Sequence, residues 1–256
     1  MTTYKKFLQL GAGCLVVLMG LVSCSPTVNE GQTQSSSGKQ SLKRDSLGHR
    51  PGPKGFTTVI IDAGHGGRDS GAIGNRLSEK EVALDTAKRL KKKLSGKFRV
   101  VMLRKGDRFM DLDDRVKVAS RYSSAVLISL HYNHSRSSYV RGPETYYWRV
   151  DSYSLATRIQ NELERVTGGR RSGLGKNRRR LRLTRNPKVP SVLVELGYLS
   201  NASEARKIQS SAYRDRLASA VADAIIDQSR LGDRGTGRLP RPLNQPLSKS
   251  TDRPGS

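Results

Sequence analysis

Two histidines follow short apolar runs and have the setting of metal ligands. His65 lies in a glycine-rich turn at residues 60–67 (IIDAGHGG), and His131 comes directly after the apolar run at 125–130. Glycines around His65 allow a sharp turn that leaves the imidazole open to a ligand, as at the carboxyl end of a strand in an α/β sheet. Because parallel strands end at the same edge of a sheet, both imidazoles could bind one metal, and neutral imidazoles suit zinc. A glycine-rich loop with an incidental histidine is the alternative.

Carboxylates near these histidines could complete a hydrolytic zinc site, which usually has a third protein ligand and a fourth position open to water. Glu79 and Glu81 compete for the third position. A capping box that begins at Ser78 would occupy Glu81, so we favour Glu79. Glu195 interrupts the apolar run at 192–197. Since burying an unpaired carboxylate is costly, we expect Glu195 near a cation, a metal or an open pocket.

Strands that alternate with helices must position these residues. Apolar and β-branched runs predict strands at 57–61, 98–103, 125–130, 144–150 and 191–196, with a short strand near 181–183. Helical periodicity predicts helices that start at Ser78 and after Asp111, one over 153–166, and a long one through Ala218, Ala222 and Ile225. This alternation predicts an α/β fold, a single layered domain with a mostly parallel central sheet flanked by helices.

The chain is strongly basic and begins with an export signal. Its 256 residues carry a formal net charge of +25, which suits polyanions such as nucleic acid or a bacterial envelope. Residues 1–23 have a basic start and an apolar stretch too short for a comfortable membrane span, which is typical of a signal peptide. The sequence LVSC at 21–24 resembles a lipobox, in which Cys24 would be lipidated; an ordinary signal with a coincidental cysteine is the alternative. Cys14 would leave with the signal, so we expect no disulfide.

Four segments follow from composition. We expect a signal peptide at 1–23, the lipidated Cys24 with a flexible tether over 24–55, a catalytic domain at 56–230 and a disordered basic tail at 231–256. The tether and the tail consist mainly of small, polar and basic residues with almost nothing to bury. We find no internal repeat.

Five ordered motifs resemble one known family. They are DAGHGG at 62–67, EK at 79–80, ISLHYN at 128–133, GPETYY at 142–147 and PSVLVELGYLSN at 190–201. Together they resemble the zinc-dependent N-acetylmuramoyl-L-alanine amidases with the type-3 catalytic domain, over roughly residues 57–228. The resemblance implies that His65, Glu79 and His131 bind one Zn²⁺ and that Glu195 is the catalytic carboxylate. It also implies the substrate, the peptidoglycan amide between N-acetylmuramic acid and L-alanine.

Neighbouring residues have less defined roles. Asp62 could be a supporting partner of a ligand histidine, or it could only cap the turn. His134 has no counterpart in the family pattern, and His49 lies in the tether. The loop at 168–185 is unusually basic, and its Arg178, Arg179 and Arg180 either form a patch for envelope anions and muropeptide carboxylates or are a solvated surface.

The stretch between His131 and Glu195 is taken up by the expected strand, helix and basic loop. It leaves no room for an inserted helix of the kind that blocks the zinc in some of these amidases. We therefore expect no built-in plug and activity without a protein activator.

Two other classes of function, a binding module and a zinc peptidase, are alternatives to an amidase. A non-catalytic basic envelope-binding module would not need two histidines at strand ends, and a nucleic-acid-binding module conflicts with the export signal and the scarcity of stacking aromatics. A zinc peptidase acting on stem peptides could use the same site; only the family resemblance argues against it. We expect peptidoglycan and, through Cys24, a membrane as partners, and no nucleic acid. The periplasmic face is the expected location, with the outer membrane favoured because Ser25 follows the cysteine.

Overall fold

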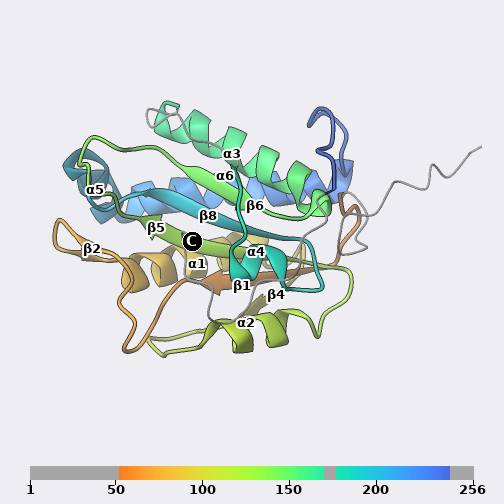
Figure 1. The fold of residues 1–256 in the computed structure, drawn as a ribbon, viewed down its shortest axis with the longest axis horizontal. Helices are drawn as coiled ribbons and strands as arrows, with labels where there is room; N and C mark the ends of the chain where they lie inside the picture. The colour runs from red at the N-terminus through yellow and green to blue at the C-terminus, as the bar shows by residue number, and fades with distance from the viewer. Residues whose placement is uncertain (1–51, 170–176, 243–256) are drawn as a thin grey trace, which may run out of the picture. The chain divides into compact units, whose positions relative to one another are not determined.

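The structure is a computed structural model that describes residues 52–169 and 177–242 (Figure 1). The expected signal peptide, Cys24, nearly all of the tether and the end of the expected tail lie outside the described residues. None of the helices formed by the described residues is long and apolar enough to cross a membrane.

A mixed sheet forms the centre of the fold, with the strand order β4-β1-β5-β8-β6-β7. Strands β4, β1, β5 and β8 are parallel, β6 is antiparallel to β8, and β7 is parallel to β6. A separate two-stranded hairpin is formed by β2 and β3. The bounds are β1 Thr58–Ala63, β2 Ile73–Gly74, β3 Leu77–Ser78, β4 Arg99–Met102, β5 Ala125–Asn133, β6 Glu144–Tyr147, β7 Asn177–Arg178 and β8 Ser191–Tyr198.

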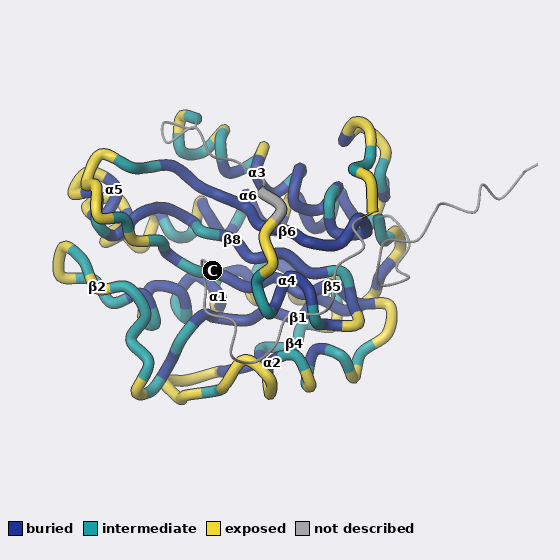
Figure 2. The backbone as a smooth tube through the Cα atoms, in the orientation of Figure 1, coloured by how far each residue is buried: buried dark blue, intermediate teal, exposed yellow. Residues whose placement is uncertain are grey.

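Helices cover both faces of this sheet. Two apolar cores of unequal size lie between the sheet and these helices. The larger core packs α1, α3 and α6 against one face, and the smaller core lies under α2 and α4 on the other. The central strands are almost entirely buried (Figure 2). The bounds are α1 Glu79–Leu94, α2 Leu112–Ala119, a 3₁₀ turn at Val150–Ser152, α3 Tyr153–Thr167, α4 Arg182–Arg185, α5 Ala202–Gln209 and α6 Ser211–Leu231.

Alternation along the strands decides which residues face the smaller core. In β1, Val59 and Ile61 belong to the larger core, whereas Ile60 belongs to the smaller one. Side chains two positions apart share a face, so Asp62 follows Ile60 onto the side of α2 and α4. The same alternation puts His131 and Glu195 on that side, because Leu130 and Val194 belong to the larger core. The chemistry of the chain therefore gathers on the face with the thinner cover.

The expected fold class, a layered domain around a mostly parallel sheet, is confirmed. Asp111 caps α2 as expected, because its side chain accepts from the amide of Asp114. Two local expectations are wrong. The segment near 181–183 begins the short helix α4 instead of a strand. Ser78 precedes α1 without a capping bond, because its hydroxyl donates to the carbonyl of Ser70.

Residues on both sides of the expected domain bounds contact α3 and α6. Ser154 Oγ donates to Asp233, and Thr236 Oγ1 bonds to Ser154 at 2.8 Å, so the segment after α6 lies on α3. At the other end, Gln228 donates to the carbonyl of Pro53 at 3.1 Å. Polar side chains of α3 and α6 therefore bind residues on both sides of 56–230.

Candidate active site

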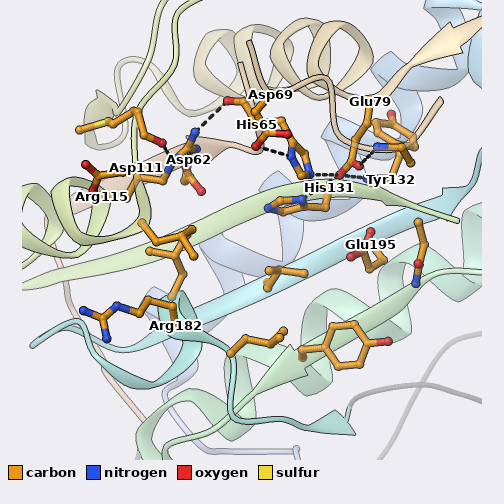
Figure 3. Close-up of a pocket in the computed structure, with 18 of the residues that line it drawn as sticks. Asp62, His65, Asp69, Glu79, Asp111, Arg115, His131, Tyr132, Arg182 and Glu195 are labelled. Atoms are coloured by element: carbon orange, nitrogen blue, oxygen red, sulfur yellow. Dashed lines mark hydrogen bonds and ion pairs between the residues drawn. The ribbon is translucent and has the colours of Figure 1, made fainter. Parts of the chain in front are cut away.

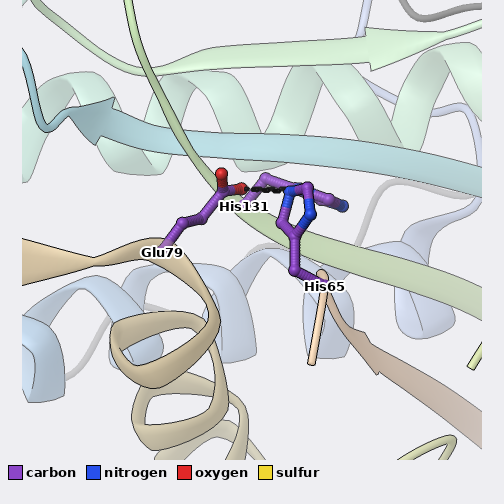
Figure 4. Close-up of side chains that lie close together, drawn as sticks. All are labelled: His65, Glu79 and His131. Carbon is purple, nitrogen blue, oxygen red and sulfur yellow. Dashed lines mark hydrogen bonds and ion pairs between the residues drawn. The ribbon is translucent and has the colours of Figure 1, made fainter. Parts of the chain in front are cut away.

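His65, Glu79 and His131 meet at the carboxyl edge of the parallel strands (Figure 4). One ligand atom from each residue lies within 4.8 Å of the other two. Glu79 Oε1 is 2.8 Å from His131 Nδ1 and 3.1 Å from His65 Nε2. The two imidazole rings are 5.0 Å apart and nearly perpendicular. Three side chains from a loop, a helix start and a strand thus converge, as the sequence predicted.

Glu79 is held as an ionised acceptor at the start of α1. Its Oε2 accepts from the amide of Ala72 at 2.8 Å, and its Oε1 accepts from the amide of Tyr132 at 3.1 Å. Burial opposes ionisation of Glu79, but hydrogen bonds from His131 and His65 outweigh it and keep its pKa well below the ordinary value. Glu81, the rival candidate, is exposed and outside this cluster. A carboxylate that is ionised and held by two backbone amides is suited to be a fixed metal ligand.

His65 adopts a left-handed backbone conformation, with φ of 59°. Such a conformation is uncommon for a residue other than glycine and must be held in place by its surroundings. The His65 carbonyl accepts from Arg115 Nη2 at 2.7 Å, and its Nδ1 lies 2.8 Å from Asp69 Oδ2. Burial lowers the pKa of His65, but bonds to Glu79 and Asp69 outweigh this and raise it. The Asp69 bond points the other nitrogen, Nε2, at Glu79.

Among the described residues, Asp62 contacts groups other than the ligand histidines. It is fully buried, accepts from Ser129 Oγ at 2.7 Å and forms an ion pair with Arg115. Arg115 also donates to the carbonyls of Ala63 and His65. Asp62 therefore acts on the His65 loop through Arg115, and Asp69 is the residue that bonds to the His65 ring. Sequence reasoning missed both Asp69 and Arg115; only the spacing of four residues between His65 and Asp69 pointed to the former.

Two glycines leave room for the cluster. A Cβ atom on Gly64 would lie 2.3 Å from His131 Cε1 and 2.5 Å from its Nδ1. A Cβ atom on Gly71 would lie 2.5 Å from the ring of His65 and 2.6 Å from Glu79 Oε2. Gly71 also has a φ of +64°, which favours glycine. The glycines of this region therefore shape the ligand cluster as well as the turn.

Glu195 lies beside the cluster because β8 pairs with β5. In the register it is opposite His131 on one side and opposite Glu144 of β6 on the other. Its Oε2 is inaccessible and has no hydrogen-bond partner among the described residues. Burial, then the charges of Glu79 and Glu144, raise the pKa of Glu195 well above its ordinary value, and only Arg179 opposes them. A carboxyl with a raised pKa holds a proton more readily than an ordinary glutamate, which suits a group that accepts and returns protons.

Glu144, which sequence reasoning quoted only as part of a motif, anchors a buried network behind Glu195. It accepts hydrogen bonds from the hydroxyls of Tyr146 and Tyr198, the latter at 2.6 Å. Burial and the bonds to Glu144 raise the pKa of both tyrosines, which stay neutral donors. Both oxygens of Glu144 are thus engaged, which fixes the side chain next to Glu195 on the same face of the sheet.

A pocket of about 750 Å³ opens over these residues (Figure 3). Leu193 and Tyr146 of the sheet line it, together with the start of α2 and residues 179–183. Of the expected basic patch, Arg179 and Arg180 line this pocket, whereas the Arg178 side chain lies outside the described residues. His134 also lines the pocket but is not part of the ligand cluster.

Comparison with known proteins identifies the family. The sequence profile of the family Amidase_3, described as N-acetylmuramoyl-L-alanine amidase, matches residues 59–227. The chain belongs to this family. It is 39% identical to the N-acetylmuramoyl-L-alanine amidase LytC of Bacillus subtilis over 68% of this chain, which spans 36% of LytC. The chain therefore corresponds to about a third of that relative's length.

Solved amidase structures share the fold. The catalytic domain of the amidase CwlV from Bacillus (Paenibacillus) polymyxa var. colistinus superposes with a TM-score of 0.63 and 38% identity, covering 67% of this chain and 97% of that domain. The amidase AmiC2 of Nostoc punctiforme gives 0.63 and 34%, covering 68% of this chain and 97% of AmiC2. The matched region covers nearly all of both solved chains, and it contains the ligand cluster and Glu195.

Proposed function

We propose that this Amidase_3 protein is a zinc-dependent peptidoglycan hydrolase. It cleaves the amide that joins N-acetylmuramic acid to the L-alanine of the stem peptide. The observation that carries the proposal is the juxtaposition of the His65, Glu79 and His131 cluster with Glu195 at the floor of an open pocket. Membership in a family of N-acetylmuramoyl-L-alanine amidases supports the choice of bond.

The donor set fits zinc. Two imidazole nitrogens and one ionised carboxylate are the ligands of hydrolytic zinc sites that keep one position for water. Asp69 orients His65, and the amides of Ala72 and Tyr132 orient Glu79, so the ligands are held before any ion binds. Bound zinc would act as a Lewis acid and make a nucleophile of its water at neutral pH.

Glu195 performs the proton transfers in this proposal. Its carboxylate takes a proton from the attacking water, and the resulting acid gives a proton to the amine of L-alanine as the carbon–nitrogen bond breaks. The raised pKa of Glu195 suits both steps, because the group holds the proton between them. Glu144 and its two tyrosines keep the neighbouring strand face rigid while Glu195 changes its charge.

A zinc peptidase that cuts within the stem peptide would use the same four residues, and the family match favours the sugar-linked amide over it. A basic envelope-binding module would account for the net charge of +25 but gives no reason for a buried carboxylate beside a ligand cluster.

We further propose that the protein is exported and acts at the periplasmic face of the envelope. In this proposal Cys24 carries a lipid that anchors the chain to a membrane, the outer one favoured by Ser25. Peptidoglycan is its partner, nucleic acid is not, and no protein activator is needed. Radiolabelled palmitate incorporation by the wild type and by Cys24→Ala tests the anchor, and cell fractionation tests the membrane.

Mass spectrometry of muropeptides after digestion of purified sacculi tests the bond and the metal together. We expect free stem peptides that begin at L-alanine, and we expect a chelator to abolish their release until zinc is added back. Fragments cut within the stem would identify a peptidase instead. Binding to sacculi with no cleavage product at any zinc concentration would identify the binding module.

A further inference from the structure

Arg179 lines the pocket, and both its backbone and its side chain are held by contacts with β6. It follows β7, and its amide donates to the carbonyl of Tyr147 at 2.9 Å, which ties the backbone to β6. The guanidinium carbon lies 4.8 Å from the centroid of the Tyr146 ring. The hydroxyl of Tyr146 is in turn bound to Glu144. The ring is therefore a rigid platform, and one face of the guanidinium lies against it.

Among the described residues, none neutralises the charge of Arg179 in an ion pair. Two other arginines that line the pocket form ion pairs, Arg115 with Asp62 and Arg182 with Asp113. Within residues 52–169 and 177–242, no carboxylate forms an ion pair with Arg179, although its charge acts on Glu195. An exposed guanidinium stacked on one face keeps its edge donors free for a carboxylate, which it can bind through two parallel hydrogen bonds.

The proposed substrate carries a carboxyl group close to the scissile bond, within reach of a residue that lines the pocket. In peptidoglycan the second stem residue is D-glutamate linked through its γ-carboxyl group, so its α-carboxyl group is a free acid or an amide. This group lies two residues beyond the scissile nitrogen, about 7 Å along an extended peptide. Tyr146 lies two residues along β6 from Glu144, the partner of Glu195, which is also about 7 Å. A stem peptide that extends along β6 from a scissile nitrogen at Glu195 would therefore bring this carboxyl group to the region of Tyr146, where Arg179 lies.

We propose that Arg179, held against Tyr146, binds the α-carboxylate of the second stem residue and makes the enzyme select stem peptides with the free acid over amidated ones. This inference rests on the proposed amidase function and adds the determinant of its stem-peptide preference. Amidation replaces an anion by a neutral group that itself carries N–H donors. It therefore removes the charge attraction and puts donors against donors at Arg179.

Binding tests the proposal without turnover. The probes are the dipeptide L-alanyl-D-isoglutamate and its α-amide, L-alanyl-D-isoglutamine, titrated calorimetrically into the zinc-loaded protein. We expect the acid to bind about tenfold more tightly, as for a hydrogen bond between charged groups. Arg179→Gln should abolish this preference, and Arg179→Lys, which keeps the charge but loses the planar fork, should retain part of it. Arg165→Gln, an exposed arginine of α3 outside the pocket, is the matched control and should retain all of it.

Turnover gives the second measurement. The ratio of kcat/KM for N-acetylmuramoyl-L-alanyl-D-isoglutamate to that for its α-amide should be about ten in the wild type and fall to near one in Arg179→Gln. Any effect of Arg179 on the acidity of Glu195 changes both rates alike and cancels in this ratio. Equal wild-type binding and turnover of the two forms, or a preference that survives in Arg179→Gln, would overturn the inference. Cleavage of neither substrate, with the binding preference intact, would instead count against the amidase function alone.

Discussion

Substituting Gly64 with alanine tests the geometry of the ligand cluster with a single methyl group. The added Cβ atom would lie 2.3 Å from His131 Cε1 and 2.5 Å from His131 Nδ1. Carbon atoms in contact prefer about 3.5–4.0 Å, so the overlap exceeds 1 Å. The amide of Gly64 donates to the carbonyl of Leu130 at 2.9 Å, which ties this backbone to the strand that carries His131. The imidazole must therefore move.

Metal–ligand distances tolerate only about 0.2 Å, so a displacement of roughly 1 Å removes His131 from the ligand set. Loss of a residue that only supports a metal ligand weakens metal binding by about 10- to 100-fold. Because His131 is itself a ligand in this proposal, we expect a larger loss of zinc affinity in Gly64→Ala. Zinc affinity is measured by competition with a chromophoric chelator, and cooperative thermal unfolding of the zinc-free protein shows that the fold survives. Gly106→Ala is the matched control, because nothing lies within 4 Å of its added Cβ atom. Wild-type zinc affinity in Gly64→Ala would refute the reasoning.

Three further predictions concern the same site. Glu195→Gln should lower kcat at least about 100-fold in sacculus digestion while zinc still binds by the chelator assay; full activity would remove Glu195 from the mechanism. Zinc binding should weaken as the pH falls through the pKa of His65, which Glu79 and Asp69 raise above its ordinary value despite burial. In calorimetric titrations, Asp69→Asn should shift the midpoint of this pH dependence to lower pH. An unmoved midpoint would contradict the role of Asp69. Arg115→Met should destabilise the protein by about 3–5 kcal/mol in urea unfolding because it leaves buried Asp62 without its ion pair, and a loss below about 1 kcal/mol would contradict this.

Strands and helices with strong local patterns were predictable from the sequence. A strand or helix that buries one face has apolar residues at regular intervals along the chain. The runs that became β1, β5 and β8 and the helix α6 lie close to their predicted positions. The hairpin of β2 and β3 and the helix α5 were missed. Short elements have too few residues for a period to show, and their conformation follows from the neighbours they contact.

The candidate site was predictable in its ligands and less so in its supports. His65, His131 and Glu195 stood out because a polar side chain at the end of, or inside, an apolar run is conspicuous. Sequence reasoning left Asp62, in the same motif as His65, as either a supporting partner of a ligand histidine or a cap of the turn. Asp62 points under the loop to Arg115 of α2, a residue that sequence distance does not connect with it.

By itself, the sequence determined which segments are buried, which turns contain glycine and which side chains break an apolar pattern, because these are local properties of the chain. Only the tertiary structure decided that β8 lies between β5 and β6, which brings Glu195 between His131 and Glu144. It also decided that Arg179 lies on the ring of Tyr146. Strand order and contacts of this kind depend on how all the elements together bury their apolar faces, so no single segment encodes them.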